Sequence, residues 1–127
     1  MAYSPSRSRH TSHQSVLTTG ATVTTIKTIP VKLNSIFYIS AIITGVRTGG
    51  SAGAVGDAAC YHIEAGAKNS AGTAVQMGSN TVLKAVEDVV GWAADITESG
   101  GNMLVRVTGA ANTDITWNAK IEVIENV

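Results

Sequence analysis

The final segment of the chain, DITWNAKIEVIEN, alternates apolar and polar residues with a period of two. Its apolar positions are Ile115, Trp117, Ala119, Ile121 and Val123, and the polar positions between them are Thr116, Asn118, Lys120 and Glu122. Because successive side chains of a β-strand point to opposite faces, this pattern predicts a strand with one face in the core.

Segments rich in β-branched residues recur from Ala21 onward, separated by the turn-forming clusters TGGSAGAVGD, KNSAGT, TESGGN and TGAANT. Short strands with a turn about every ten residues predict an all-β fold. We expect an antiparallel, jelly-roll-like β-sandwich of about seven or eight strands. The segment NTVLKAVEDVVGWAADI also fits helical spacing. Its β-branched content and Gly91 favour strand, turn and strand, with a helical turn near Ala85–Val89 as the alternative.

One predicted strand, SIFYISAIITGV, is apolar on both faces. Phe37, Ile39, Ala41 and Ile43 alternate there with Tyr38, Ser40, Ile42 and Thr44. A strand of this kind needs cover on both sides, and a neighbouring subunit can supply the second cover. Phe37, Tyr38 and Ile42 are therefore candidates for a subunit interface.

The first residues differ from the rest, since they are rich in Ser and Thr and nearly lack large apolar groups. We predict a flexible N-terminal arm over residues 1–19 and a β-sandwich domain over residues 20–127. The candidate partner-binding residues of the arm are Arg7, Arg9, His10 and His13.

Charge is divided unevenly along a chain with no net charge. Residues 1–56 carry five basic residues and no acid, whereas residues 57–127 carry four basic and nine acidic residues. A basic arm favours docking on an acidic surface. The open alternative is that these dispersed charges only keep the chain soluble.

Several function classes are not expected from the sequence. No apolar run approaches the ~18 residues that would span a membrane, and no apolar stretch follows the first basic residues as in a signal peptide. The single cysteine, Cys60, excludes an intrachain disulfide and is interpreted as a small apolar residue of a strand rather than a nucleophile. Three histidines and one cysteine are too few for a typical zinc site.

Catalytic and nucleic-acid signatures are also missing from the sequence. The glycines of GGSAGAVG do not match a phosphate-binding loop and are interpreted as a flexible connection between strands. The acids Glu87, Asp88, Asp95 and Glu98 are interpreted as solvated turn residues, and no nucleophile motif is present. Trp92 and Trp117 alternate with small apolar residues, which favours core packing over base stacking. We therefore expect no enzyme activity, no cofactor, no metal and no nucleic-acid partner.

From about Gly53 to Val127 the sequence resembles a β-rich domain of tailed-bacteriophage virion proteins, both capsid decoration (cement) proteins and tail-fibre or tail-tip modules. The resemblance is carried by the GAKN and GTA turn, the Trp followed by small residues in GWAADI, and VTGAANTDITWNAKIEV at the end. It implies a β-sandwich that forms a homotrimer and has no catalytic residues.

The resemblance leads to a predicted function and two alternatives. We predict a capsid decoration protein, assembled in the host cytoplasm, that binds the major capsid protein on the virion surface. The first alternative is a tail-fibre or receptor-binding module that contacts a host glycan through TGGSAGAVGD or TESGGN. The second, ranked last, is a sugar hydrolase like some tail spikes, which would need a carboxylate pair that is not recognisable here.

Overall fold

A computed structural model of the chain describes residues 7–126. Eight strands follow one another in chain order: β1 (Arg7–Thr18), β2 (Val23–Pro30), β3 (Ser35–Gly50), β4 (Ala58–Asn69), β5 (Val75–Glu87), β6 (Ala93–Ser99), β7 (Asn102–Thr108) and β8 (Thr113–Asn126). No helix occurs within the described range, so none there is long and apolar enough to cross a membrane. The predicted all-β fold of seven or eight strands is confirmed.

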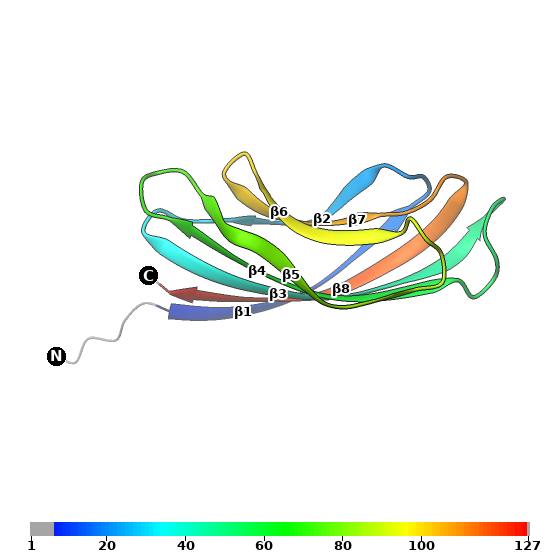
Figure 1. Ribbon diagram of the computed structural model, residues 1–127, viewed down its shortest axis with the longest axis horizontal. Helices are drawn as coiled ribbons and strands as arrows, with labels where there is room; N and C mark the ends of the chain where they lie inside the picture. The colour runs from blue at the N-terminus through cyan, green and yellow to red at the C-terminus, as the bar shows by residue number, and fades with distance from the viewer. Residues whose placement is uncertain (1–6, 127) are drawn as a thin grey trace.

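The strands form two antiparallel sheets packed face to face (Figure 1). The larger sheet has the order β1-β8-β3-β4-β5, and the smaller one, with the order β2-β7-β6, lies above β1, β3 and β8 in the figure. The pairs β1 with β8 and β2 with β7 nest within the chain order, as in jelly rolls, whereas β3 and β4 form a simple hairpin. We call the end where β1 begins and β8 finishes the terminal end of the sandwich.

The closing strand β8 lies between β1 and β3 and shows the predicted alternation. Its inward residues are buried, from Ile115 at 0% exposure to Val123 at 7%. Residues paired with them on β3 (Ile39, Ala41 and Ile43) are fully buried as well. The two-residue period of the sequence therefore sets which side of the larger sheet forms the core.

Residues 7–18 do not form the predicted flexible arm. Arg7–Thr18 is instead the edge strand β1, which pairs with β8 along its whole length. Its inward positions grade from exposed His10 to buried Thr18, so burial increases toward the end of the strand. Backbone hydrogen bonding to β8 does not require large apolar side chains, and hydroxyl residues suit the half-buried surface of an edge strand. The part of the arm before Arg7 lies outside the described residues.

The ambiguous segment is strand, turn and strand, as the sequence favoured. β5 continues to Glu87, β6 begins at Ala93, and Gly91 adopts a positive φ of 105° in the turn between them. Every residue of β5 is exposed or half-buried. This edge strand is therefore held mainly by its pairing with β4.

An aromatic cluster fills the core away from the terminal end. Trp117 packs with its ring centroid 5.8 Å from that of Trp92 and 6.4 Å from that of Tyr61. Its indole Nε1 donates a hydrogen bond of 2.9 Å to Thr18 Oγ1. A Cβ atom at Gly45 would lie only 2.6 Å from the indole ring, so only glycine leaves room for it there.

The two buried tryptophans offer a matched test of this core. Trp117 donates a hydrogen bond, whereas Trp92 Nε1 has no acceptor among residues 7–126. We expect Trp117→Phe to lower the free energy of unfolding by about 1–2 kcal/mol more than Trp92→Phe, because it leaves a buried hydroxyl without its donor. Denaturant titration of both variants measures the difference, and equal losses would contradict it.

Candidate functional site

The face of the larger sheet that points away from the smaller sheet carries many apolar side chains. We call this surface the outer face. Its large apolar residues, each 40–57% exposed, are Leu17, Ile36, Tyr38, Ile42, Val46, Val75, Met77, Val86 and Ile124. Four of them lie on the central strand β3. Polar residues stand between them, since Ile42 is flanked by His62 on β4 and Lys120 on β8.

A shallow hollow of about 370 Å³ lies on this face across β1, β8 and β3. His13 and Ile42, predicted separately as an arm residue and an interface residue, both line it. Tyr38 lies on the same face, two rows toward the terminal end, and pairs with Gly66 of β4. The structure thus brings three of the predicted residues onto one surface.

Phe37 is placed differently from the other interface candidates. It points to the opposite side of β3, where it is 5% exposed and belongs to the core. Alternation along the strand puts Tyr38 and Ile42 outside and Phe37 inside. Phe37 therefore packs within its own chain, and an interface role remains a prediction for Tyr38 and Ile42.

The arm cation Arg9 has a partner within its own chain. Its guanidinium Nε and Nη2 atoms lie 3.1 Å and 2.7 Å from Glu122 Oε2 on the outer face. The Arg9 side chain is 70% exposed, and exposed ion pairs contribute about 0–1 kcal/mol. Arg7 pairs with Asn126 through its backbone, and its side chain lies outside the described residues.

A Ser–His–Glu contact on the outer face lacks the geometry of a catalytic triad. Ser40 Oγ lies 3.1 Å from His62 Nε2, and Glu64 Oε2 lies 3.7 Å from the same nitrogen. In a triad the acid holds the other ring nitrogen, so that the one facing the hydroxyl can accept its proton. These residues form a polar contact between β3 and β4 instead. Glu64 also accepts a hydrogen bond from Tyr38, which raises the pKa of that tyrosine.

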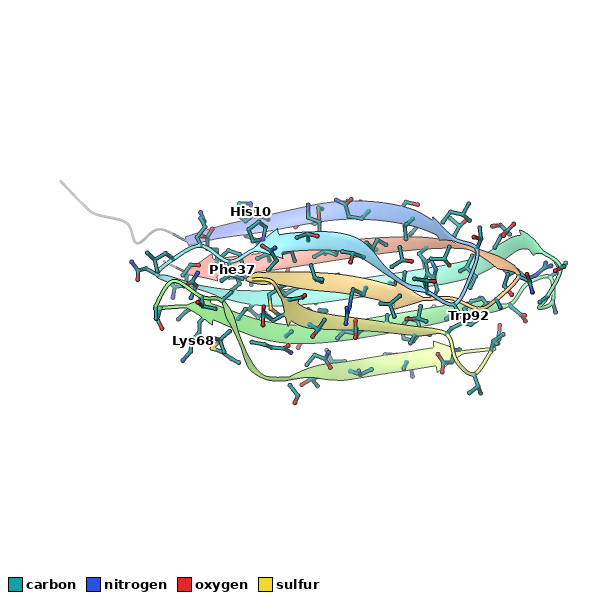
Figure 2. All side chains as sticks on the ribbon, turned by 90° about the horizontal axis from the view of Figure 1, so that it is seen from above. His10, Phe37, Lys68 and Trp92 are labelled. Carbon is teal, nitrogen blue, oxygen red and sulfur yellow. The ribbon has the colours of Figure 1, made fainter. Side chains whose placement is uncertain are left out.

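A second concave surface, which we call the edge groove, lies between the two sheets at the terminal end. It has a volume of about 420 Å³ and is lined by residues of β1, β2, β3 and β8 and by Lys32 of the β2–β3 connection. Figure 2 shows His10 and Phe37 together at this end of the molecule, with Trp92 toward the other end. Two further predicted residues, one from the arm and one from the core strand, thus meet in this groove.

Glu125 gives the edge groove its chemistry. It stands opposite Phe37 in the pairing of β3 with β8 and is only 2% exposed. Lys32 Nζ lies 3.0 Å from its Oε2 atom, and His10 Nε2 lies 3.7 Å from Oε1. A buried carboxylate is costly unless it is paired, and Lys32 provides the opposite charge.

Glu125 was not among the site residues expected from the sequence. The alternation of β8 could have identified it, since position 125 follows in phase with the buried positions from Ile115 to Val123. An acid in phase with core positions at the end of a strand indicates either a sheet end open to water or a buried ion pair. The structure shows a buried ion pair beside a groove.

The remaining predicted features are spread over the molecule. Cys60 lies in strand β4, as the sequence predicted, and is exposed on the outer face opposite Thr44. The glycine-rich segment joins β3 to β4 as predicted, and Arg47 donates hydrogen bonds of 2.8 Å to Gly50 O and Ala52 O there. This connection and the β6–β7 turn lie at opposite ends of the sandwich (Figure 1), so they form two separate surfaces. Residues 7–126 contain no cluster of three or more His, Cys, Asp or Glu side chains suited to a metal ion.

Comparison with known proteins establishes the fold. No protein-family model matches the sequence, and no curated protein does either. Among solved structures the chain is similar to the Acinetobacter baumannii phage AM24 tailspike protein, with a TM-score of 0.54 and 10% identity over 95% of this chain and 26% of that one. It is also similar to tailspike protein gp49 of A. baumannii bacteriophage Fri1, a capsular polysaccharide depolymerase (TM-score 0.48, 12% identity, 91% and 17% covered). A third similar structure is the tailspike of Acinetobacter phage vB_ApiP_P1 (TM-score 0.42, 10% identity, 94% and 22% covered).

The chain spans about a quarter or less of the length of these tailspikes. At 10% identity, the similarity to the AM24 tailspike shows a shared fold and nothing more. The predicted β-sandwich fold is therefore also present in part of the AM24 tailspike.

Tyr61 gives the sandwich a predicted sensitivity to alkaline pH. Burial raises the pKa of Tyr61, and a 2.5 Å hydrogen bond from its hydroxyl to Glu87 Oε2 raises it further. Because the folded-state pKa lies above the unfolded value of about 10, this stabilisation is complete below pH ~10 and is lost as the pH rises further. We expect Tyr61→Phe to flatten the fall in free energy of unfolding between about pH 9 and pH 11.

Denaturant titrations across that range measure this effect. Tyr38→Phe is the matched control, because Tyr38 is 44% exposed and water screens its contact with Glu64. An alkaline decline that is the same in wild type and Tyr61→Phe would show that the decline has another source.

Proposed function

We propose that this chain is a non-catalytic structural module of a bacteriophage virion, located in the tail. The observation that carries the proposal is the similarity of 95% of the chain to part of the AM24 tailspike. The sequence resemblance to phage virion proteins over Gly53–Val127 supports the same class independently. Tail location is favoured over the capsid surface because the structural likeness is to a tail protein.

Capsid decoration, with the major capsid protein as partner, is the second candidate. This candidate requires a flexible basic arm that reaches the shell. Residues from Arg7 onward instead form β1, and Arg9 is paired with Glu122. Arg9 is nevertheless 70% exposed, so it is available to an acidic capsid surface.

The position of the protein on the particle tests both candidates. We expect quantitative mass spectrometry of purified virions to give a low copy number, and immunogold labelling to mark the tail. Tail-less capsids from the same host are the control and should lack the protein. A high copy number on those capsids would overturn the tail assignment in favour of decoration.

We further propose that the module works as a homo-oligomer, the trimer implied by the sequence resemblance, through the outer face. Nine large apolar side chains on that face are 40–57% exposed, and an interface there would remove apolar surface from water. Covering it with a second copy would also bury the apolar residues of the central strand β3. Tyr38 and Ile42 are the residues on which we expect this association to depend.

Substitution of Ile42 by Glu tests the interface. We expect wild type to be oligomeric at micromolar concentration by multi-angle light scattering and Ile42→Glu to be monomeric, because the variant places a charge on the central strand of the outer face, where the proposed interface would bury it. The matched control is Val90→Glu, since Val90 is 95% exposed in the β5–β6 turn and not on the outer face.

The single cysteine supplies a second readout. Cys60 is exposed on the outer face of the isolated chain, so oligomerisation through that face should slow its labelling by a maleimide. Ile42→Glu should restore fast labelling, and Val90→Glu should not. A monomeric wild type with concentration-independent labelling would overturn the proposed self-association while leaving the virion assignment intact.

A further inference from the structure

The edge groove is a built concave site at an inter-sheet edge, separate from the outer face. Phe37 and Glu125 line it at 5% and 2% exposure, so both are fixed by the core rather than by solvent. The β2–β3 connection beside it is held by Asn69, whose Nδ2 donates a 3.0 Å hydrogen bond to Val31 O. Its volume of about 420 Å³ lies within the ~300–1,000 Å³ of small-ligand sites.

The lining of the groove combines two kinds of surface. Apolar walls come from Ile29, Pro30, Phe37, Ile121 and Val123. Among them stand the Glu125 carboxylate, which only accepts hydrogen bonds, and the Lys27 and Lys32 ammonium groups, which only donate them. The ligand that fits must therefore have apolar faces and, on its rim, both donors and acceptors.

Glu125 has unused capacity for hydrogen bonding. Its Oε2 atom is enclosed and, although 3.0 Å from Lys32 Nζ, makes no hydrogen bond of good geometry with any described residue. An ionised carboxylate has about four acceptor sites. Because Oε2 is enclosed, hydroxyl groups of a ligand would donate to Oε1, which lies 3.7 Å from His10 Nε2.

The charge of the groove selects among hydroxyl-rich ligands. Lys32 is engaged with Glu125, whereas Lys27 forms no ion pair with any residue in the described range. Two lysines facing one carboxylate leave a net positive charge, which disfavours a cationic ligand and favours one that carries an anion.

We propose that the edge groove binds a single ring of an acidic sugar, such as a uronic acid residue of a polysaccharide. The C–H faces of the ring would pack between Phe37 and the walls from β2, its hydroxyls would donate to Glu125, and its carboxylate would pair with Lys27. The proposal rests on the groove alone and stands independently of the proposed self-association and virion location.

Titration of the full-length 15N-labelled protein with glucuronic acid, glucose and inorganic phosphate tests this assignment. We expect both sugars to shift the backbone amides of His10, Ser12 and Thr28, which lie on β1 and β2 along the groove. Glucuronate should bind about three-fold more tightly than glucose, the factor expected for one partly exposed ion pair. Phosphate should not compete with glucose, because it has no ring to fill the walls.

Two variants and a control assign the roles of the side chains. Lys27→Ala should abolish the preference for glucuronate while glucose still binds. Glu125→Gln should weaken glucose about five-fold through loss of charge-assisted hydrogen bonds, and glucuronate less, because the lost carboxylate no longer repels it. The control is Lys68→Ala, since Lys68 lies at the same end of the molecule but outside the groove (Figure 2). Amide spectra of each variant verify that the fold is kept.

Three outcomes would overturn the proposal. If neither glucose nor glucuronic acid shifts the groove amides, then no sugar binds there. Phosphate matching glucuronate while glucose is inert would identify a simple anion site. An unchanged preference for glucuronate in Lys27→Ala, with Glu125→Gln binding like wild type, would place the sugar elsewhere on the surface.

Discussion

The packing of the Trp117 indole is the constraint on which the rest of the sandwich depends. Its ring lies against Gly45 of β3, where any side chain would clash, and its Nε1 atom donates to Thr18 at the end of β1. Contacts with Tyr61 and Trp92 extend this cluster to β4 and to the start of β6. One side chain therefore fixes the spacing of three neighbouring strands in the larger sheet and the approach of the smaller one. The buried hydrogen bond also gives the edge strand β1 a defined end, although most of its side chains are polar.

This concentration of aromatic volume away from the terminal end explains why the sandwich is open where β1 begins. Inward positions of β1 there are His10 and Ser12, and β8 contributes Glu125 instead of a further aliphatic residue. Small or polar side chains do not fill the space between β1 and β2, so a groove remains above Phe37. The ion pair of Glu125 with Lys32 is the consequence, because an acid at an inward position needs a cation within reach.

The sequence predicted the features that depend on local pattern and missed those that depend on pairing partners. Alternation in β8 and turn chemistry identified the strands, and the absence of helix followed from β-branched content. The residues of β1 were interpreted as an arm because a composition rich in Ser and Thr does not show that β8 offers a free edge. Phe37 and Tyr38 were grouped as interface residues since a strand that is apolar on both faces does not reveal which face meets the second sheet. Glu125 was overlooked because a charged residue near a strand end is ordinarily solvated.

The two surfaces with functional potential lie on opposite sides of the same sheet, and alternation makes this separation possible. Within β3, Phe37 lines the edge groove while the adjacent Tyr38 lies on the outer face. Within β8, Glu125 faces the groove and Ile124 faces outward. A module that associates through the outer face would keep its groove open to solvent, since the covering subunit would contact outer-face neighbours of the groove residues, such as Tyr38 and Ile124. Substitutions at adjacent residues, such as Phe37 and Tyr38, can therefore change ligand binding and assembly independently, because neighbouring side chains of a strand point to opposite faces of the sheet.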